Sequence, residues 1–427
     1  MAPHKKLPED MIRCIFACVA QDRAIHFTYY RDDVPPQVVL SRVCSAWRQI
    51  ALDMGSLWSC VTVVPRNNLR AFHEIWPLRI TGHLTVYLTL PYPSCVTSRE
   101  DLWDPLLRFQ LTEIEFVMDT AQLRELHQIS DEVSLRVERV GLVIKGRRLK
   151  VERPPQFISR LLYSFRLRAS LENEDYGYFD PENFLLPWSQ LRRLELRGIL
   201  IHLSSFRQLL QQCTSLEACL ADVCPARDAD VMPVEPVNLV FLQQFTVIAR
   251  TLPLGALSCL LLPDLRILEV RGGPWTDESH EVFRNQFNLE RLHDLDITRI
   301  KNPPPLISIL KDAPSLRRLY LPWTVIFDEE SLCGLTNGQL GQHLESLRLF
   351  ELSCNVDDII KMVESRREAR KLGYGLCPLF HVQMIYMGRE DDELRNRLLA
   401  FNDSNMRIEL VPIKEVGNDA HLHPCDA

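Results

Sequence analysis

The sequence predicts an α/β chain in which a small helical segment precedes a long solenoid of strand–helix repeats. Three observations lead to this prediction. A pattern of apolar-x-x-apolar-x-apolar recurs along residues 111–349. Segments with helical apolar spacing lie between its copies, and residues 7–58 show helical spacing from the start. Units of this kind bury an apolar face by stacking on their neighbours, which yields a curved parallel sheet with outer helices.

The repeated pattern keeps a nearly regular period. Successive copies begin 23 to 29 residues apart, a period typical of leucine-rich repeats. The alternative is a chance Leu-rich pattern in an ordinary α/β domain. The Asn that usually follows each strand of such repeats is absent, so we expect an irregular solenoid with Gly198, Gly272 and Pro322 in that region. The copies begin at Leu111, Val137, Leu162, Leu191, Leu216, Leu242, Leu265, Leu292, Leu316 and Leu344.

Helices are expected between the repeated strands, with Asp277 and Asp328 as N-caps. The chain after the last copy should form one more helix, one more strand and the segments that close the end. The four intervening helices are predicted at residues 205–213, 277–287, 305–311 and 328–335. The later elements are predicted as a helix at 356–371, a strand at 382–387, and closing segments at 391–400 and 407–411.

The composition predicts a soluble protein of the cytoplasm or nucleus. Apolar residues make up 46% and charged residues 25%, and a net charge of −7 offers no basic field for nucleic acid. Thirteen cysteines without an apolar signal segment indicate reduced thiols. The longest apolar run, Leu252 to Leu262, contains Pro253 and is too short to span a bilayer. We therefore expect neither a nucleic-acid nor a membrane partner.

The sequence offers no convincing catalytic constellation, so an enzyme is not expected. Its 16 glycines form neither a phosphate loop nor a dinucleotide motif, and no Gly-x-Ser-x-Gly or His-Glu-x-x-His motif occurs. His202, Cys213, Cys219 and Cys224 have spacings that match no common zinc module, and core thiols are the favoured interpretation. We predict no catalytic residue, metal or cofactor.

The N-terminal residues predict short amphipathic helices. Pro8, Glu9 and Asp10 suit a helix start, and the apolar residues that follow have helical spacing. Helices this short bury only part of their apolar surface against one another, which implies a partner helix or packing on the next domain. The two apolar sets are Met11, Ile12, Ile15, Phe16, Val19 and Val39, Leu40, Val43, Cys44, Trp47, Ile50, Ala51.

The order of these residues adds a resemblance. Leu-Pro-x-Asp from Leu7, Ile15-Phe16, Val-Cys-x-x-Trp-Arg-x-Ile-Ala from Val43 and Leu57-Trp58 resemble the F-box of many fungal proteins. Residues 69–88, with a Trp-x-x-Arg-x-x-Gly segment, resemble the linker that follows the F-box in mushroom-type fungal proteins. One departure is the longer connection at residues 21–37, which we expect to be a surface loop.

The resemblance implies that these helices bind the Skp adaptor of an SCF-type cullin–RING ubiquitin ligase. The adaptor-binding residues carried over from the motif are Leu7, Pro8, Ile12, Ile15, Phe16, Leu40, Val43, Cys44, Trp47 and Ile50. The predicted organisation is an F-box module at 1–63, a linker and first repeat at 64–105, irregular leucine-rich repeats at 106–412 and a polar tail at 413–427. The predicted function is substrate recognition for the ligase. The alternative is a scaffold whose helices only cap the solenoid.

Strand alternation predicts the surface that would hold an unknown protein target. If the first, fourth and sixth residues of each copy face the core, the third, fifth and seventh face the concave side. Arginine there can pair with an acidic or phosphorylated segment, although ordinary strand-surface polarity is an alternative. The predicted target-binding residues are Arg166, Arg168, Arg193, Glu195, Arg197, Glu269, Arg271, Asp296, Tyr320, Arg348 and Phe350. Arg366, on the predicted helix at 356–371, is expected to complement the helix dipole near its C-terminal end.

Overall fold

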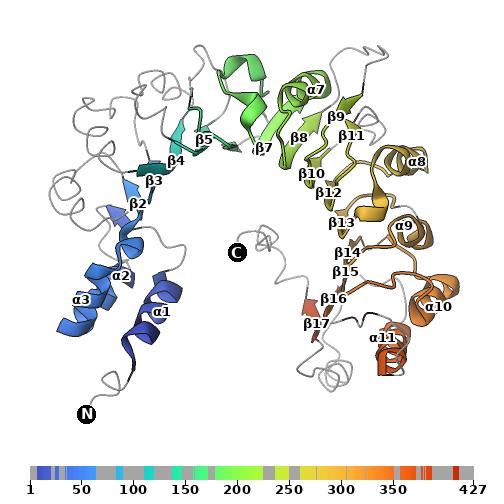
Figure 1. Ribbon diagram of the computed structural model, residues 1–427. Coiled ribbons are helices and arrows are strands. Elements are labelled where there is room, and N and C mark those ends of the chain that lie inside the picture. Colours follow the sequence, from blue (N-terminus) through green and yellow to red (C-terminus); the bar gives the residue numbers. More distant parts are fainter. Residues whose placement is uncertain are drawn as a thin grey trace. The chain divides into compact units, whose positions relative to one another are not determined.

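The chain folds as two compact units. Unit 1 comprises Met1–Ile201 and Gln212–Leu216, and unit 2 comprises His202–Gln211 and Glu217–Ala427. The structure is a computed structural model (Figure 1). It describes residues 7–20, 25–27, 34, 36–63, 83–89, 110–119, 137–146, 157, 159–171, 178–224, 236–249, 260–275, 277–303, 305–322, 324–350, 356–371, 377, 379, 381–386 and 407–412.

Unit 1 begins with three short helices that pack on one another. Helix α1 contacts α2, α3 and the short 3-10 helix η2. Cys44 separates α2 from α3 because its backbone is extended and its Sγ accepts a hydrogen bond from the Trp47 amide at 3.5 Å, which caps α3. The bounds are α1 (Glu9–Ala20), α2 (Pro36–Val43), α3 (Ser45–Asp53) and η2 (Gly55–Trp58).

Seven described strands of unit 1 pair in parallel, each with the next along the chain. The expectation of a surface loop at 21–37 was wrong in part, because residues 25–27 form β1 and pair with β2. The strands are β1 (Ile25–Phe27), β2 (Cys60–Val63), β3 (His83–Thr89), β4 (Gln110–Asp119), β5 (Arg139–Gly146), β6 (Ser164–Leu171) and β7 (Arg193–His202). The 3-10 helices η6 (Pro181–Asn183) and η7 (Trp188–Gln190) lie between β6 and β7.

Unit 2 repeats a strand and a helix. Its long parallel sheet has the order β8, β10, β12, β13, β14, β15, β16, β17. The strands are β8 (Ala218–Cys224), β10 (Gln244–Ile248), β12 (Ile267–Arg271), β13 (Asp294–Arg299), β14 (Arg318–Leu321), β15 (Ser346–Phe350), β16 (His381–Tyr386) and β17 (Arg407–Pro412). A second sheet pairs β9 (Val237–Asn238) with β11 (Leu260–Leu261).

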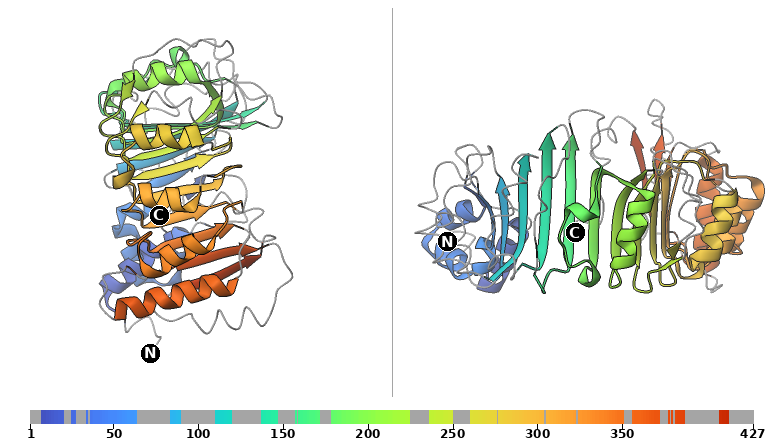
Figure 2. Two further views of the ribbon diagram at one scale, coloured as in Figure 1. Left: turned by 90° about the vertical axis from the view of Figure 1, so that its right-hand side faces the viewer. Right: turned by 90° about the horizontal axis from the view of Figure 1, so that it is seen from above.

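The helices of unit 2 lie along one face of this long sheet, as the yellow to red-orange helices of Figure 1 and both views of Figure 2 show for α8 to α11. One sheet face is therefore covered, and the other carries the alternate residues of each strand. The helices are α7 (Leu203–Gln212), α8 (Asp277–Gln286), α9 (Leu306–Asp312), α10 (Glu329–Asn337) and α11 (Val356–Lys371), with the 3-10 helix η9 (Leu289–Arg291).

The predicted parallel sheet with intervening helices is confirmed. Leu316, Leu319 and Leu321, the first, fourth and sixth residues of one copy, are fully buried. Leu319 lies opposite Leu347 in the next strand, so equivalent repeat positions stack in register. The four intervening helices and α11 form within two residues of their predicted bounds. The predicted segment at 391–400 and the tail at 413–427 lie outside the described residues.

Two local details, a helix cap and a glycine within strand β7, match the irregular repeat. The Oδ1 of Asp328 accepts a hydrogen bond from the Ser331 amide at 2.8 Å, which confirms this residue as the N-cap of α10. Gly198 has a φ of +69°, and a Cβ there would lie 2.4 Å from the carbonyl oxygen of Ala169. Glycine therefore takes this position because a side chain would meet both backbone strain and a backbone atom.

The expectation for Arg366 as a helix-end cation was wrong. Its side chain is 0% exposed and donates hydrogen bonds to the carbonyl oxygens of Leu335, Gly341 and Cys377 at 2.8, 2.9 and 2.9 Å. Burial lowers the pKa of Arg366 to about 10, which still leaves the guanidinium charged at neutral pH. Arg366 thus ties α11 to the end of α10 and to the segments that precede β15 and β16.

Replacing Arg366 with Ala should lower the free energy of unfolding by about 3 kcal/mol, because three carbonyls lose a charge-assisted donor inside the protein. Arg367→Ala is the matched control, since the neighbouring side chain is exposed and its loss should cost less than about 0.5 kcal/mol. Urea denaturation of both variants measures the difference. Equal stability of the two variants would contradict the buried position of Arg366.

Candidate functional site

The predicted adaptor-binding residues divide into an inner and an outer set. Ile12, Phe16, Leu40 and Ile50 are buried. The Phe16 ring meets the Trp47 ring edge-on with centroids 5.0 Å apart, and Trp47 and Cys44 are partly exposed. The inner set holds the three helices together, so its loss would unfold them.

The outer set forms what we call the N-terminal apolar surface. Four of its members were predicted for adaptor binding, namely Leu7, Pro8, Ile15 and Val43, and all are exposed. Three further members were missed: Met11, Val19 and Val39 have exposed fractions of 53%, 46% and 50%. Their spacing could have found them, because residues 11, 15 and 19 recur every fourth position on one side of α1. Positions 39 and 43 do the same on α2.

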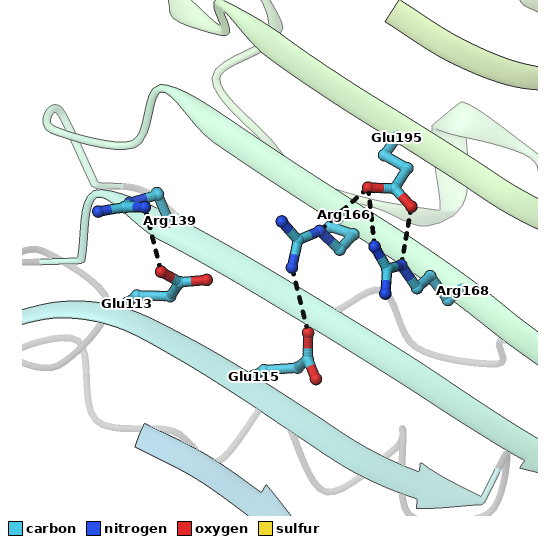
Figure 3. A network of polar contacts seen from close by, with 6 residues as sticks. All are labelled: Glu113, Glu115, Arg139, Arg166, Arg168 and Glu195. Carbon is cyan, nitrogen blue, oxygen red and sulfur yellow. Dashed lines mark hydrogen bonds and ion pairs between the residues drawn. The ribbon is translucent and has the colours of Figure 1, made fainter. Parts of the chain in front are cut away.

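The open face of each sheet carries the third, fifth and seventh residues of each repeat. In unit 1 this face holds a network of ion pairs, drawn in Figure 3. Arg166 bridges two strands, with Nη1 3.4 Å from Glu115 Oε2 and Nε 3.0 Å from Glu195 Oε2. Arg168 adds a forked contact to Glu195, at 2.7 Å from Nε and 3.3 Å from Nη2. The structure thus brings Arg166, Arg168 and Glu195 together as one cluster.

Glycine at position 141 makes the longest of these contacts possible. Glu115, Gly141 and Arg166 lie opposite one another on β4, β5 and β6. Two strand spacings separate Glu115 from Arg166, about 10 Å of backbone. A Cβ at Gly141 would lie 2.9 Å from the Glu115 Cγ. The missing side chain leaves room for the Glu115 side chain, and Arg166 meets it across β5.

The same alternation rule locates charged residues that the sequence analysis left out. Glu113 and Arg139 pair at 3.2 Å on β4 and β5. Asp294 and Arg318 form a forked pair on β13 and β14, with distances of 2.7 and 2.6 Å. The repeat pattern alone was enough to place these charged residues on the open face. The third repeat positions are Glu113, Arg139, Asp294 and Arg318, and Glu115 is a fifth position.

In unit 2, two predicted target-binding residues are internal. Glu269 and Arg271 are buried and pair with each other, and Thr246 Oγ1 donates a hydrogen bond to Glu269 at 3.2 Å. Asp296 accepts hydrogen bonds from the amide and hydroxyl of Thr298 at 3.0 and 2.8 Å. Burial, and then the neighbouring Glu269, raise the pKa of Asp296. These carboxylates are therefore engaged within the fold.

The remaining predicted target-binding residues do not form one continuous cluster. Asp296, Tyr320 and Arg348 lie opposite one another on β13, β14 and β15. On β7, Arg193 is exposed and Arg197 is partly exposed. The Phe350 side chain lies outside the described residues. The structure thus gathers these residues into local groups within each unit.

The described cysteines carry free thiols in different surroundings. Cys213 and Cys219 are buried, and the Cys224 Sγ lies 3.5 Å from His202 Nδ1. Within the described residues no group of three or more His, Cys, Asp or Glu side chains is arranged to hold a metal ion. Burial raises the pKa of the Cys213 thiol to about 12.

Comparisons with known proteins assign the chain to no family. No protein-family model matches the sequence, and no curated protein shows significant similarity to it. Functional inference therefore rests on the residues and geometry described above. Among the helices that the structure describes, none has the length and apolar character needed to cross a membrane.

Cys213 should resist alkylation in the native protein. Its raised pKa keeps the thiol protonated well above neutral pH, and burial excludes the reagent. Iodoacetamide should label the exposed Cys333 and leave Cys213 unlabelled in the native protein. Peptide mass spectrometry after timed labelling follows each site. Prompt labelling of Cys213 under native conditions would show that this core opens.

Proposed function

We propose that the chain is the substrate-recognition subunit of an SCF-type cullin–RING ubiquitin ligase. In this proposal the N-terminal helices bind the Skp adaptor, and the open faces of the repeats hold a target protein. The order of residues in 7–58, which resembles a fungal F-box, supports the adaptor half. The parallel sheet, whose one face carries charged and aromatic side chains, supports the target half, because solenoids use such faces to bind proteins.

The single observation that carries the proposal is the exposure pattern of the N-terminal helices. Helix α1 buries Ile12 and Phe16 inside unit 1 while Met11, Ile15 and Val19 remain exposed. Residues that only stabilised a helical cap would bury their apolar side chains against the rest of the unit. Covering a large apolar side chain contributes about 1.5–3 kcal/mol, so several of them together provide the driving force for a stable partner complex.

Adaptor capture should depend on the outer set. Co-expression with the Skp adaptor should give a complex that survives purification, and Ile15→Asp combined with Val43→Asp should abolish it, because two charges would be buried against the partner. Ile326→Asp is the control, since this apolar residue of unit 2 is 71% exposed and lies outside the N-terminal apolar surface. Size-exclusion chromatography with mass determination measures the complex.

Substitutions in the outer set test adaptor binding alone, whereas substitutions in the inner set also destabilise the helices. Trp47→Ala would remove the contact with Phe16 and could release the adaptor by unfolding the helices. Unchanged melting temperatures for Ile15→Asp and Val43→Asp establish that loss of the complex reports on binding. Wild-type chain that folds and never captures the adaptor would refute the adaptor half of the proposal.

A scaffold whose helices only cap the solenoid is the second candidate, and one feature favours it. The 3-10 helix η2 contacts β2, and Trp58 within it is buried, with Nε1 donating a hydrogen bond to the Ala51 carbonyl at 2.7 Å. The helical segment is therefore bonded into unit 1 at the start of its sheet. A scaffold predicts a stable chain without adaptor capture, whereas the receptor predicts both.

A further inference from the structure

Arg348 differs from two other arginines at alternate repeat positions of unit 2. Arg271 pairs with Glu269, and Arg318 pairs with Asp294. Within the part of the chain that the structure describes, Arg348 has neither an ion pair nor a hydrogen bond, and its Nε is enclosed without an acceptor. An enclosed guanidinium N–H without an acceptor costs free energy, so the Arg348 guanidinium lacks the partners that stabilise those of Arg271 and Arg318.

The neighbours of Arg348 supply a second donor. Tyr320 lies opposite Arg348 on β14, and Gln383 lies opposite it on β16. Tyr320 is half-buried, and burial raises the pKa of its hydroxyl, which therefore keeps its proton at neutral pH. The Tyr320 hydroxyl is therefore a hydrogen-bond donor on the strand next to the Arg348 guanidinium.

We propose that Arg348, with Tyr320 beside it, is the receptor site for a single carboxylate, carried by an Asp or Glu side chain of the target protein. This inference rests on the proposed function and names the chemistry of the target. The planar guanidinium forms two parallel hydrogen bonds to a carboxylate, which fixes the orientation of the bound segment.

The charges of the row favour a carboxylate over a phosphoryl group. Glu269 and Asp294 pair with their own arginines, whereas among the described side chains Arg348 has no ion pair and shares its row with the carboxylate of Asp296. Arg348 and Asp296 are two strands apart, about 10 Å. One cation balances one negative charge. A phosphoserine carries about −1.5 to −2, and its excess charge would face Asp296, with no second unpaired arginine among the described side chains of this row.

A random-peptide array probed with the purified full-length chain tests this assignment. Wild-type chain should select peptides with Asp or Glu at one fixed position. Arg348→Gln should weaken binding of the best such peptide by about tenfold or more, the loss expected for a charge-assisted hydrogen bond. Arg348→Glu should reverse the selection toward Lys or Arg, and Arg348→Lys should give an intermediate loss. Arg284→Gln, at an exposed arginine of helix α8 outside the predicted target-binding set, is the matched control and should keep the wild-type selection.

The outcomes separate this inference from the proposed function. Melting temperatures of the Arg348 variants should equal that of the wild type, because the described residues give this side chain no ion pair or hydrogen bond. Adaptor capture, measured on the same variants, tests the ligase role and should not change. Acidic selection that persists in Arg348→Gln, the absence of any acidic selection, or stronger binding of phosphoserine than glutamate peptides would each overturn the carboxylate assignment, whether or not the adaptor binds.

Discussion

One-sided burial of short parallel strands is the constraint on which the rest of the structure depends. Each strand places apolar residues at the first, fourth and sixth repeat positions in the core, and equivalent positions lie opposite one another in successive strands. A single strand–helix unit cannot cover these residues, so it needs neighbours on both sides. The same alternation sends the third, fifth and seventh residues outward in rows. Core and binding face are therefore consequences of one periodicity.

The rows explain why many of the described open-face charges pair with one another. In-register stacking places residues from successive repeats about 4.8 Å apart, within reach of Arg and Glu side chains. Arg166 thus meets Glu195 on the next strand and Glu115 beyond Gly141. Partly exposed pairs of this kind contribute little to stability, about 1 kcal/mol or less each. Their larger effect is on recognition, since a paired arginine is less available to a partner than Arg348.

The sequence predicted the repeated strands, the intervening helices and the inward positions, because all of these follow from local spacing. Helix α11 was predicted with the bounds that the structure has. The pairing of Arg318 with Asp294 depends on register between strands 24 residues apart, which spacing alone does not set. Burial of Arg366 was not predictable either, since its acceptors come from three distant backbone segments. The strand β1 is too short to show a period.

Hydrogen exchange of the full chain with and without the Skp adaptor tests the central claim most directly, because it locates the contact on the folded protein. The receptor account predicts slower amide exchange in α1 and α2 when the adaptor is present. It also predicts unchanged exchange in β12 to β15, which remain open for the target. Unchanged exchange in α1 and α2 at saturating adaptor, or protection confined to the repeat strands, would contradict the account.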